Sequence, residues 1–167
     1  TTRSVAVALA SELGVRLDVV AVGTEQSVTS RLTAVGNEAA AADVNCEIAI
    51  RHGNDPAAEI RSAALAANTQ LLVIGRRLYP GATEVGPVAQ RILAAAPCAV
   101  LVVAPGSQLW SRRVLVAFDG SDAARSATEL AAQLAKPRQL PITLFAITDS
   151  SERLPTEIED AAQLSIA

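Results

Sequence analysis

Two apolar runs with a helical segment between them are the most informative part of this sequence: Leu71-Leu72-Val73-Ile74-Gly75 and Pro97-Cys98-Ala99-Val100-Leu101-Val102-Val103, joined through Gly86-Pro87-Val88-Ala89-Gln90-Arg91-Ile92-Leu93. Both runs are short, β-branched and continuous, as in strands buried on both faces of a parallel sheet. Between them, Val88, Ile92 and Ala96 recur at helical spacing. The stretch predicts a strand, loop, helix and strand. The first turn of the helix would lie at the carboxyl ends of the strands, where open α/β sheets bind ligands.

Helices and strands alternate along the rest of the chain in the same way. The first helix is expected to end at Gly14, the second to be capped by Thr24 or Ser27, and the third by Asn54 or Asp55. The order predicts an α/β fold with an open, doubly wound parallel sheet and helices on both faces. The predicted helices are 1–13, 24–42, 56–67, 86–96, 122–135 and 154–167, and the predicted strands are 17–22, 46–50, 71–75, 97–103, 113–118 and 142–147.

Composition excludes several classes of protein. Half of the 167 residues are hydrophobic, only 2% are aromatic, and the formal net charge is −3. The chain therefore lacks the basic footprint of a nucleic-acid-binding protein. No apolar run approaches the roughly 20 residues that span a bilayer, and no signal peptide opens the sequence. We expect a cytoplasmic protein with no nucleic-acid or membrane partner. Because the sequence contains no methionine, we also expect it to be a processed or partial chain.

Few side chains suggest catalysis or metal binding. His52 is the only histidine, and it lies beside Gly53 with no nucleophile or carboxylate at useful spacing, so we interpret it as a surface turn residue. Cys46 and Cys98 fall in separate apolar strands, which favours free buried thiols over a disulfide or a metal pair. We therefore predict no catalytic residue, no metal site and no enzymatic activity.

The sequence contains an internal repeat. The segment 1–13 aligns with 122–134, with Ala6, Leu9, Ala10 and Leu13 opposite the same residue types at 127, 130, 131 and 134. The first copy lacks the counterpart of 112–121, and the second stops before a glycine loop. In the second copy we predict that Ala127, Leu130 and Leu134 face inward.

The stretch from Leu71 to Val103 resembles the universal stress protein family. Nucleotide-binding members of that family have a strand that ends in glycine, a glycine loop, a glycine that opens a helix, and an Ala-Pro-Cys-x-Val strand. Here Gly75, Gly86 and the segment 96–103 match, while Leu78 and Pro87 depart from the pattern. Arg113 to Ser121 resembles the family's opening strand and its Asp-x-Ser signature. The resemblance implies a five-stranded sheet of the adenine nucleotide alpha-hydrolase-like type, with the first strand central and next to the fourth.

The resemblance also implies a site. Nucleotide-binding members contact the ribose or base after the first strand, the base at the end of the second strand, and the phosphates at the glycine loop. The implied ligand is ATP or another adenine nucleotide, with Mg²⁺. A turn with a helix cap is the alternative interpretation of Asp119-Gly120-Ser121. Arg76 and Arg77 could reach an anion over the loop, or could simply be solvated. The implied nucleotide-binding residues are Val22, Gly75, Gly81, Gly86, Asp119, Ser121 and Ile147.

Two incomplete domains follow from this resemblance. Residues 1–104 would form a first domain without its opening strand, 105–112 a linker, and 113–167 the start of a second domain. Arg113–Phe118 could alternatively fill the place of the missing strand. The implied function is a stress-response or regulatory module that forms a homodimer or pseudo-dimer through Val100–Val103. The alternatives are a nucleotide-free dimerisation scaffold, favoured by Leu78 and Pro87, and an ATP-using enzyme of the wider group.

Overall fold

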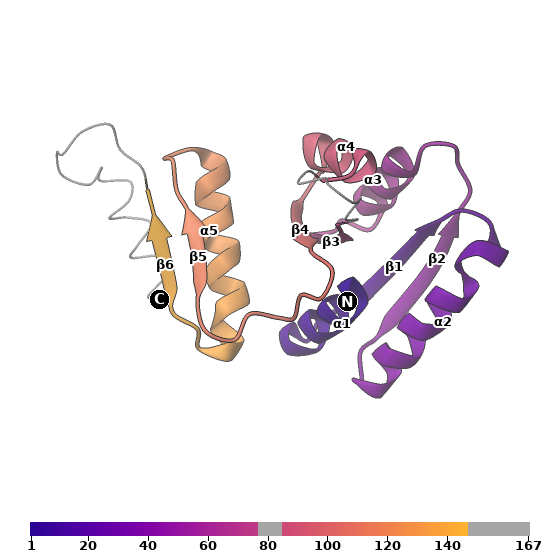
Figure 1. Cartoon of the computed structure of the whole chain (residues 1–167), viewed down its shortest axis with the longest axis horizontal. Helices are drawn as coiled ribbons and strands as arrows, with labels where there is room; N and C mark the ends of the chain where they lie inside the picture. The colour runs from indigo at the N-terminus through magenta and orange to yellow at the C-terminus, as the bar shows by residue number, and fades with distance from the viewer. Residues whose placement is uncertain (77–84, 147–167) are drawn as a thin grey trace. The chain divides into compact units, whose positions relative to one another are not determined.

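A computed structural model of the chain describes residues 1–76 and 85–146. The chain divides into two compact units, 1–109 and 110–167 (Figure 1). Several predictions lie outside the described residues: the helix at 154–167, the site residues Gly81 and Ile147, and the anion contact suggested for Arg77. Within the described ranges, no helix is long and apolar enough to cross a membrane.

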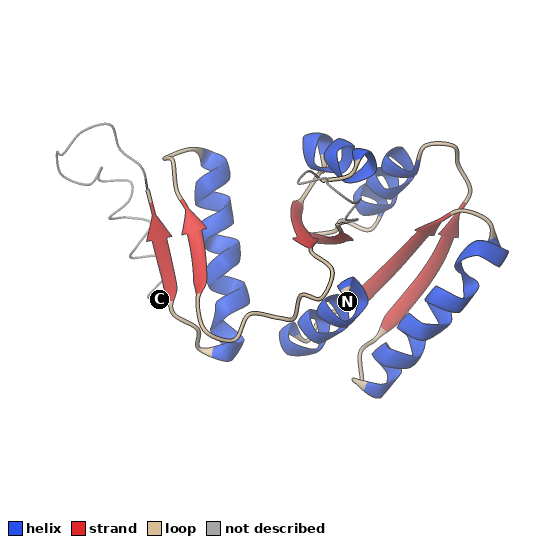
Figure 2. Ribbon diagram, in the orientation of Figure 1, coloured by secondary structure: helices blue, strands red, loops and turns tan. Residues whose placement is uncertain are grey.

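The first unit alternates helices and strands, and its strands pair in parallel (Figure 2). The α/β prediction and the order of its elements are confirmed. The elements are α1 (Thr2–Leu13), β1 (Leu17–Val22), α2 (Glu25–Ala41), β2 (Cys46–Arg51), α3 (Pro56–Ala66), β3 (Leu71–Gly75), α4 (Pro87–Ala95) and β4 (Ala99–Val103).

Local signals in the sequence set most of the helix ends. Gly14 ends α1 in the left-handed conformation, with φ 63° and ψ 34°, which glycine adopts without steric cost. Asp55 begins α3, because its carboxylate accepts hydrogen bonds from the backbone N–H groups of Ala57 at 3.1 Å and Ala58 at 3.2 Å. The start of α2 differs from the prediction. Thr24 occupies the N-cap position but makes no side-chain cap, and the Ser27 hydroxyl donates to the Thr24 carbonyl at 2.8 Å.

The four strands of the first unit form two separate pairs instead of one continuous sheet. β1 pairs with β2 from Leu17–Cys46 to Val22–Arg51, and β3 pairs with β4 from Leu71–Ala99 to Gly75–Val103. This corrects the expectation of one five-stranded sheet. In a five-stranded sheet whose first strand is central, the loss of that strand separates the other four into two pairs, as observed here.

Helices cover both faces of β3. Its residues Leu72 and Ile74 pack with Ala57 of α3 and with Ala89 and Ile92 of α4 in one apolar cluster. Successive residues of a strand face opposite sides. Gly75 accordingly points away from that cluster and lies against α1, which contacts both β1 and β3. A second cluster joins α1 to α2 and the starts of β1 and β2; its buried members are Val7, Ala10, Ala39 and Val44.

The second unit is described from Trp110 to Ala146, and Figure 1 shows its two strands side by side with a helix along them. It contains β5 (Val114–Ala117), α5 (Asp122–Ala135), a 3₁₀ turn (Lys136–Arg138) and β6 (Ile142–Phe145). β5 and β6 are parallel, and the Phe118 N–H extends the ladder to the Phe145 carbonyl at 2.9 Å. The hypothesis that Arg113–Phe118 fills the place of the missing strand is therefore wrong, because these backbone groups pair within the second unit.

Candidate functional site

Two predicted site residues of the first unit, Val22 and Gly75, lie at the carboxyl ends of its strands. Val22 is the last residue of β1, and Gly75 is the last residue of β3. After Val22 the chain turns at Gly23, whose backbone N–H donates to the Arg51 carbonyl at 3.0 Å. Val22 and Gly75 end strands of different pairs, so the structure places them at the same kind of position without joining them in one sheet.

Gly75 has a structural role that the sequence pattern does not show. A Cβ atom added at residue 75 would lie 2.6 Å from the Oγ1 atom of Thr2, closer than real Cβ contacts come. The first turn of α1 therefore lies so close to the end of β3 that a side chain at residue 75 would force Thr2 to move. This close approach gives the glycine a structural role whether or not a ligand binds nearby.

Helix α4 begins at Gly86 with backbone donors that no side chain caps in the described part of the chain. The Gly86 carbonyl accepts the first intrahelical bond, from the Gln90 N–H at 3.0 Å. Pro87, at the first helical position, has no N–H to offer. The N–H groups of Val88 and Ala89 belong to the first turn and have no acceptor within the helix. Such donors, at the positive end of a helix dipole, suit an anion.

This helix start lies beside the end of β3. Val85, directly before Gly86, packs on the cluster that contains Ile74. Arg76 follows β3, and its backbone N–H donates to the Val103 carbonyl at 2.8 Å, which extends the ladder with β4. The side-chain Nε atom of Arg76 is buried and has no hydrogen-bond partner in the described residues. The Arg76 guanidinium, a permanent cation with an unsatisfied donor, therefore lies at the same end of the sheet as the start of α4.

An ion pair that the sequence does not reveal joins α3 and α4. Asp55, the cap of α3, accepts from the Arg91 guanidinium at 2.5 Å. The hydrogen bond from Arg91, followed by those from the backbone, lowers the pKa of the Asp55 carboxyl. An aspartate before a proline signals the cap, but nothing in the linear sequence indicates the partner, which is 36 residues away. The pair ties the two helices together on one face of β3.

In the second unit, Asp119 and Ser121 are joined in the cap of α5. The Asp119 Oδ1 atom accepts from the Ser121 hydroxyl at 2.6 Å and from the Ser121 N–H at 3.0 Å. The Ser121 oxygen in turn accepts from the Ala124 N–H at 3.1 Å. The two bonds that Asp119 accepts from Ser121 lower the pKa of the Asp119 carboxyl, and the bond from the hydroxyl is the larger cause. The turn-and-cap interpretation is thus confirmed, while the contact with a nucleotide stays a prediction.

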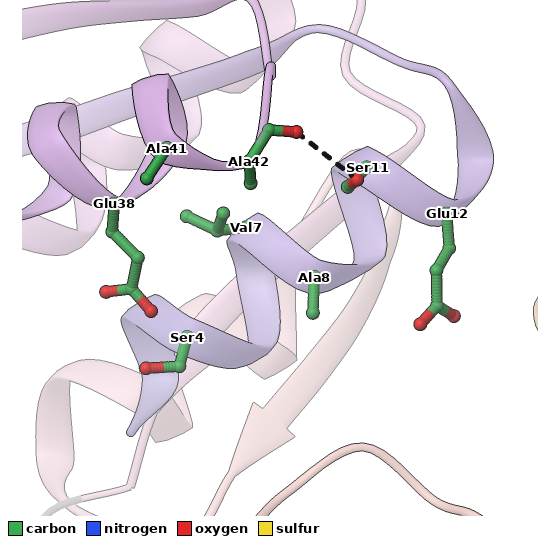
Figure 3. Close-up of a pocket in the computed structure, with 8 residues that line it drawn as sticks. All are labelled: Ser4, Val7, Ala8, Ser11, Glu12, Glu38, Ala41 and Ala42. Atoms are coloured by element: carbon green, nitrogen blue, oxygen red, sulfur yellow. Dashed lines mark hydrogen bonds between the residues drawn. The ribbon is translucent and has the colours of Figure 1, made fainter.

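A shallow groove between α1 and α2 does not coincide with the predicted residues. Most of its lining is small, and the Ser11 hydroxyl donates to the Ala42 carbonyl at 3.5 Å across it (Figure 3). At one end the Glu38 carboxylate pairs with Arg3 of α1. The lining residues are Ser4, Val7, Ala8, Ser11, Glu12, Glu38, Ala41 and Ala42.

The histidine and the two cysteines lie at separate places in the first unit. His52 is exposed in the turn after β2. Cys46 and Cys98 are free thiols, and burial raises the pKa of each. Among residues 1–76 and 85–146, no group of three or more histidine, cysteine or acidic residues is placed to hold a metal ion.

Comparison with known proteins gives a family and a fold. The model of the universal stress protein family matches residues 4–104 and again residues 111–166. A structure described as a universal stress protein of Pseudomonas aeruginosa UCBPP-PA14 aligns with a TM-score of 0.67 at 14% identity, over 89% of this chain and 55% of that one. The hypothetical protein MJ0577 aligns with a TM-score of 0.48 at 15% identity, over 56% of this chain and 78% of that one. A search of the curated proteins found no match.

The two matched segments together cover most of the chain. Each falls within one of the two compact units, so the internal repeat read from the sequence corresponds to two copies of the same family pattern. The parallel strands and flanking helices agree with the α/β fold of the Pseudomonas aeruginosa structure. The chain belongs to the universal stress protein family.

Proposed function

We propose that this chain is a regulatory module of the stress response whose first unit binds the phosphates of ATP, or of another adenine nucleotide, at the start of α4. One observation carries the proposal. An uncapped helix N-terminus lies at the carboxyl end of β3, beside an arginine whose buried Nε has no partner in the described residues. Phosphate oxygens would accept from the N–H groups of Val88 and Ala89, and the Arg76 guanidinium would offset their charge.

The other contacts of the nucleotide follow the family resemblance. The backbone at Val22, the last residue of β1, would meet the base. Asp119 and Ser121 would meet the ribose or base of a nucleotide held by the second unit, since a carboxylate accepts from ribose hydroxyls. Mg²⁺ would arrive with the phosphates it neutralises. Because Pro87 removes one of the backbone donors, we expect the affinity to be modest.

We also propose that nucleotide binding has a regulatory purpose and is not followed by catalysis. The loop between β3 and α4, residues 76–86, contains no lysine that could bridge the β- and γ-phosphates during transfer. Regulation through a bound nucleotide needs only a conformation or an assembly that differs between the bound and free forms. Pairing through β4, whose known partner is β3, would provide such an assembly in the cytoplasm.

A second candidate is a scaffold that dimerises without nucleotide. The contact between Gly75 and Thr2 favours it, because this contact gives the first glycine of the pattern a purely structural reason. Pro87, which departs from the family pattern, favours it too, because proline removes a backbone donor from the first turn of α4. The two candidates differ in whether the start of α4 is occupied by an anion.

Calorimetric titration of ATP into the whole chain separates the candidates. Gly86 has extended backbone angles, φ −60° and ψ 160°, which residues with a side chain also adopt without backbone strain. Gly86→Asp places a carboxylate where it caps the same N–H groups and repels phosphate. We expect it to weaken ATP binding by about tenfold or more, which corresponds to about 1.4 kcal/mol or more. Gly86→Asn adds a similar cap without the charge and is the matched control, with a smaller loss expected.

A second pair of variants tests the cation. Arg76→Gln should weaken ATP binding, whereas Arg61→Gln, which removes an exposed arginine from α3, should leave it unchanged. Absence of heat at millimolar ATP with the unaltered chain would contradict nucleotide binding. If sedimentation velocity then showed a dimer whose mass is insensitive to ATP, the scaffold would become the better account.

A further inference from the structure

We draw no further inference here: the strongest candidate, the open edges of β1 and β3 in residues 1–109, where four strands form two separate pairs, carries nothing because the strand that the internal repeat would place there is already paired with β6 and no other described residue shows what covers those edges.

Discussion

Helices α1 and α5 hold equivalent places in the internal repeat, yet they are buried in different ways. The buried residues of α1 spread over about 200° of its circumference, and those of α5 over about 120°. The reason lies in their neighbours: α1 contacts α2, β1 and β3, whereas α5 contacts β5, β6 and the 3₁₀ turn. The buried sets are Val5, Val7, Leu9 and Ala10 in α1, and Ala124, Thr128, Ala131, Leu134 and Ala135 in α5.

Only part of the burial pattern is shared between equivalent positions. Val7 and Thr128 are both buried, and so are Ala10 and Ala131. Leu9 is buried while its counterpart Leu130 is half-buried, and the relation is reversed for Leu13 and Leu134. An alignment of the two copies therefore transfers the helix from one copy to the other, but it does not transfer the depth of each side chain. Depth depends on the elements that surround the helix.

The largest expected effects come from truncating these leucines. Leu9→Ala and Leu134→Ala remove buried side chains and should lower the free energy of unfolding of their own units by about 2–5 kcal/mol. Leu130→Ala and Leu13→Ala remove half-buried side chains and should cost about 1 kcal/mol, since less apolar surface is lost from the core. Hydrogen exchange of amides in α1 and α5 would measure each unit separately.

The test is whether the ranking reverses between the two units. Leu9→Ala should cost more than Leu13→Ala, whereas Leu130→Ala should cost less than Leu134→Ala. If Leu9→Ala and Leu130→Ala lowered protection of their helices equally, the different surroundings of α1 and α5 would not control their stability. The pairs are matched because each compares the same residue type at equivalent positions of the repeat. A loss confined to the mutated unit would also show that the two units unfold independently.

The close approach of α1 to the end of β3 can be tested by changing one side-chain atom. Gly75→Ala would force the new methyl group against the Oγ1 atom of Thr2, and we expect a loss of about 1–2 kcal/mol from this overpacking. Thr2→Ala in the same chain removes the obstructing oxygen and should restore most of the loss. A calorimetric scan of the single and double variants measures both. Failure of Thr2→Ala to rescue would mean that Gly75 is required for another reason.

The sequence was sufficient to predict the described helices and strands, because each apolar run has a clear period and ends at a recognisable residue such as Gly14 or Asp55. It was less successful with side-chain orientation. Ala127 was expected to face inward, and Val88 to share a helical stripe with Ile92, but Ala127 and Val88 are both exposed. In α4 the buried residues are instead Ala89 and Ile92. In Ala-rich helices several stripes are almost equally apolar, so the packing partners decide which one is buried.

The candidate site was predictable only where it depends on neighbouring residues. The cap formed by Asp119 and Ser121 spans two positions and could be read directly. The contact of Thr2 with Gly75 and the pairing of Asp55 with Arg91 join residues far apart in the chain, so no local pattern could reveal them. The burial of the Arg76 Nε atom likewise depends on the folded structure and has no signal in the sequence.

A moderate difference is expected between the two helix caps. Ser121→Ala removes the oxygen that accepts from the Ala124 N–H at 3.1 Å and should cost about 1 kcal/mol of the stability of α5. Thr1→Ala should cost less, because the equivalent bond from the Ser4 N–H is 3.3 Å long. Amide exchange in the first turn of each helix measures the difference. Equal losses would show that the Asp119 turn adds nothing to the cap of α5.

The smallest effect concerns the titration of Asp119. Its pKa is lowered in the folded chain, mainly by the hydrogen bond from the Ser121 hydroxyl. A lowered pKa means that the carboxylate contributes its full stabilisation above its ordinary pKa of 3.8 and loses it as the pH falls through the folded value. Ser121→Ala should therefore raise the pKa of Asp119 toward 3.8, while the backbone N–H bond keeps it somewhat below. An NMR titration of the Asp119 carboxyl carbon would detect the shift. An unchanged pKa would show that the bond between the Ser121 hydroxyl and Asp119 is absent in solution. The caps of α1 and α5 would then differ only in the length of the hydrogen bond that each cap oxygen accepts.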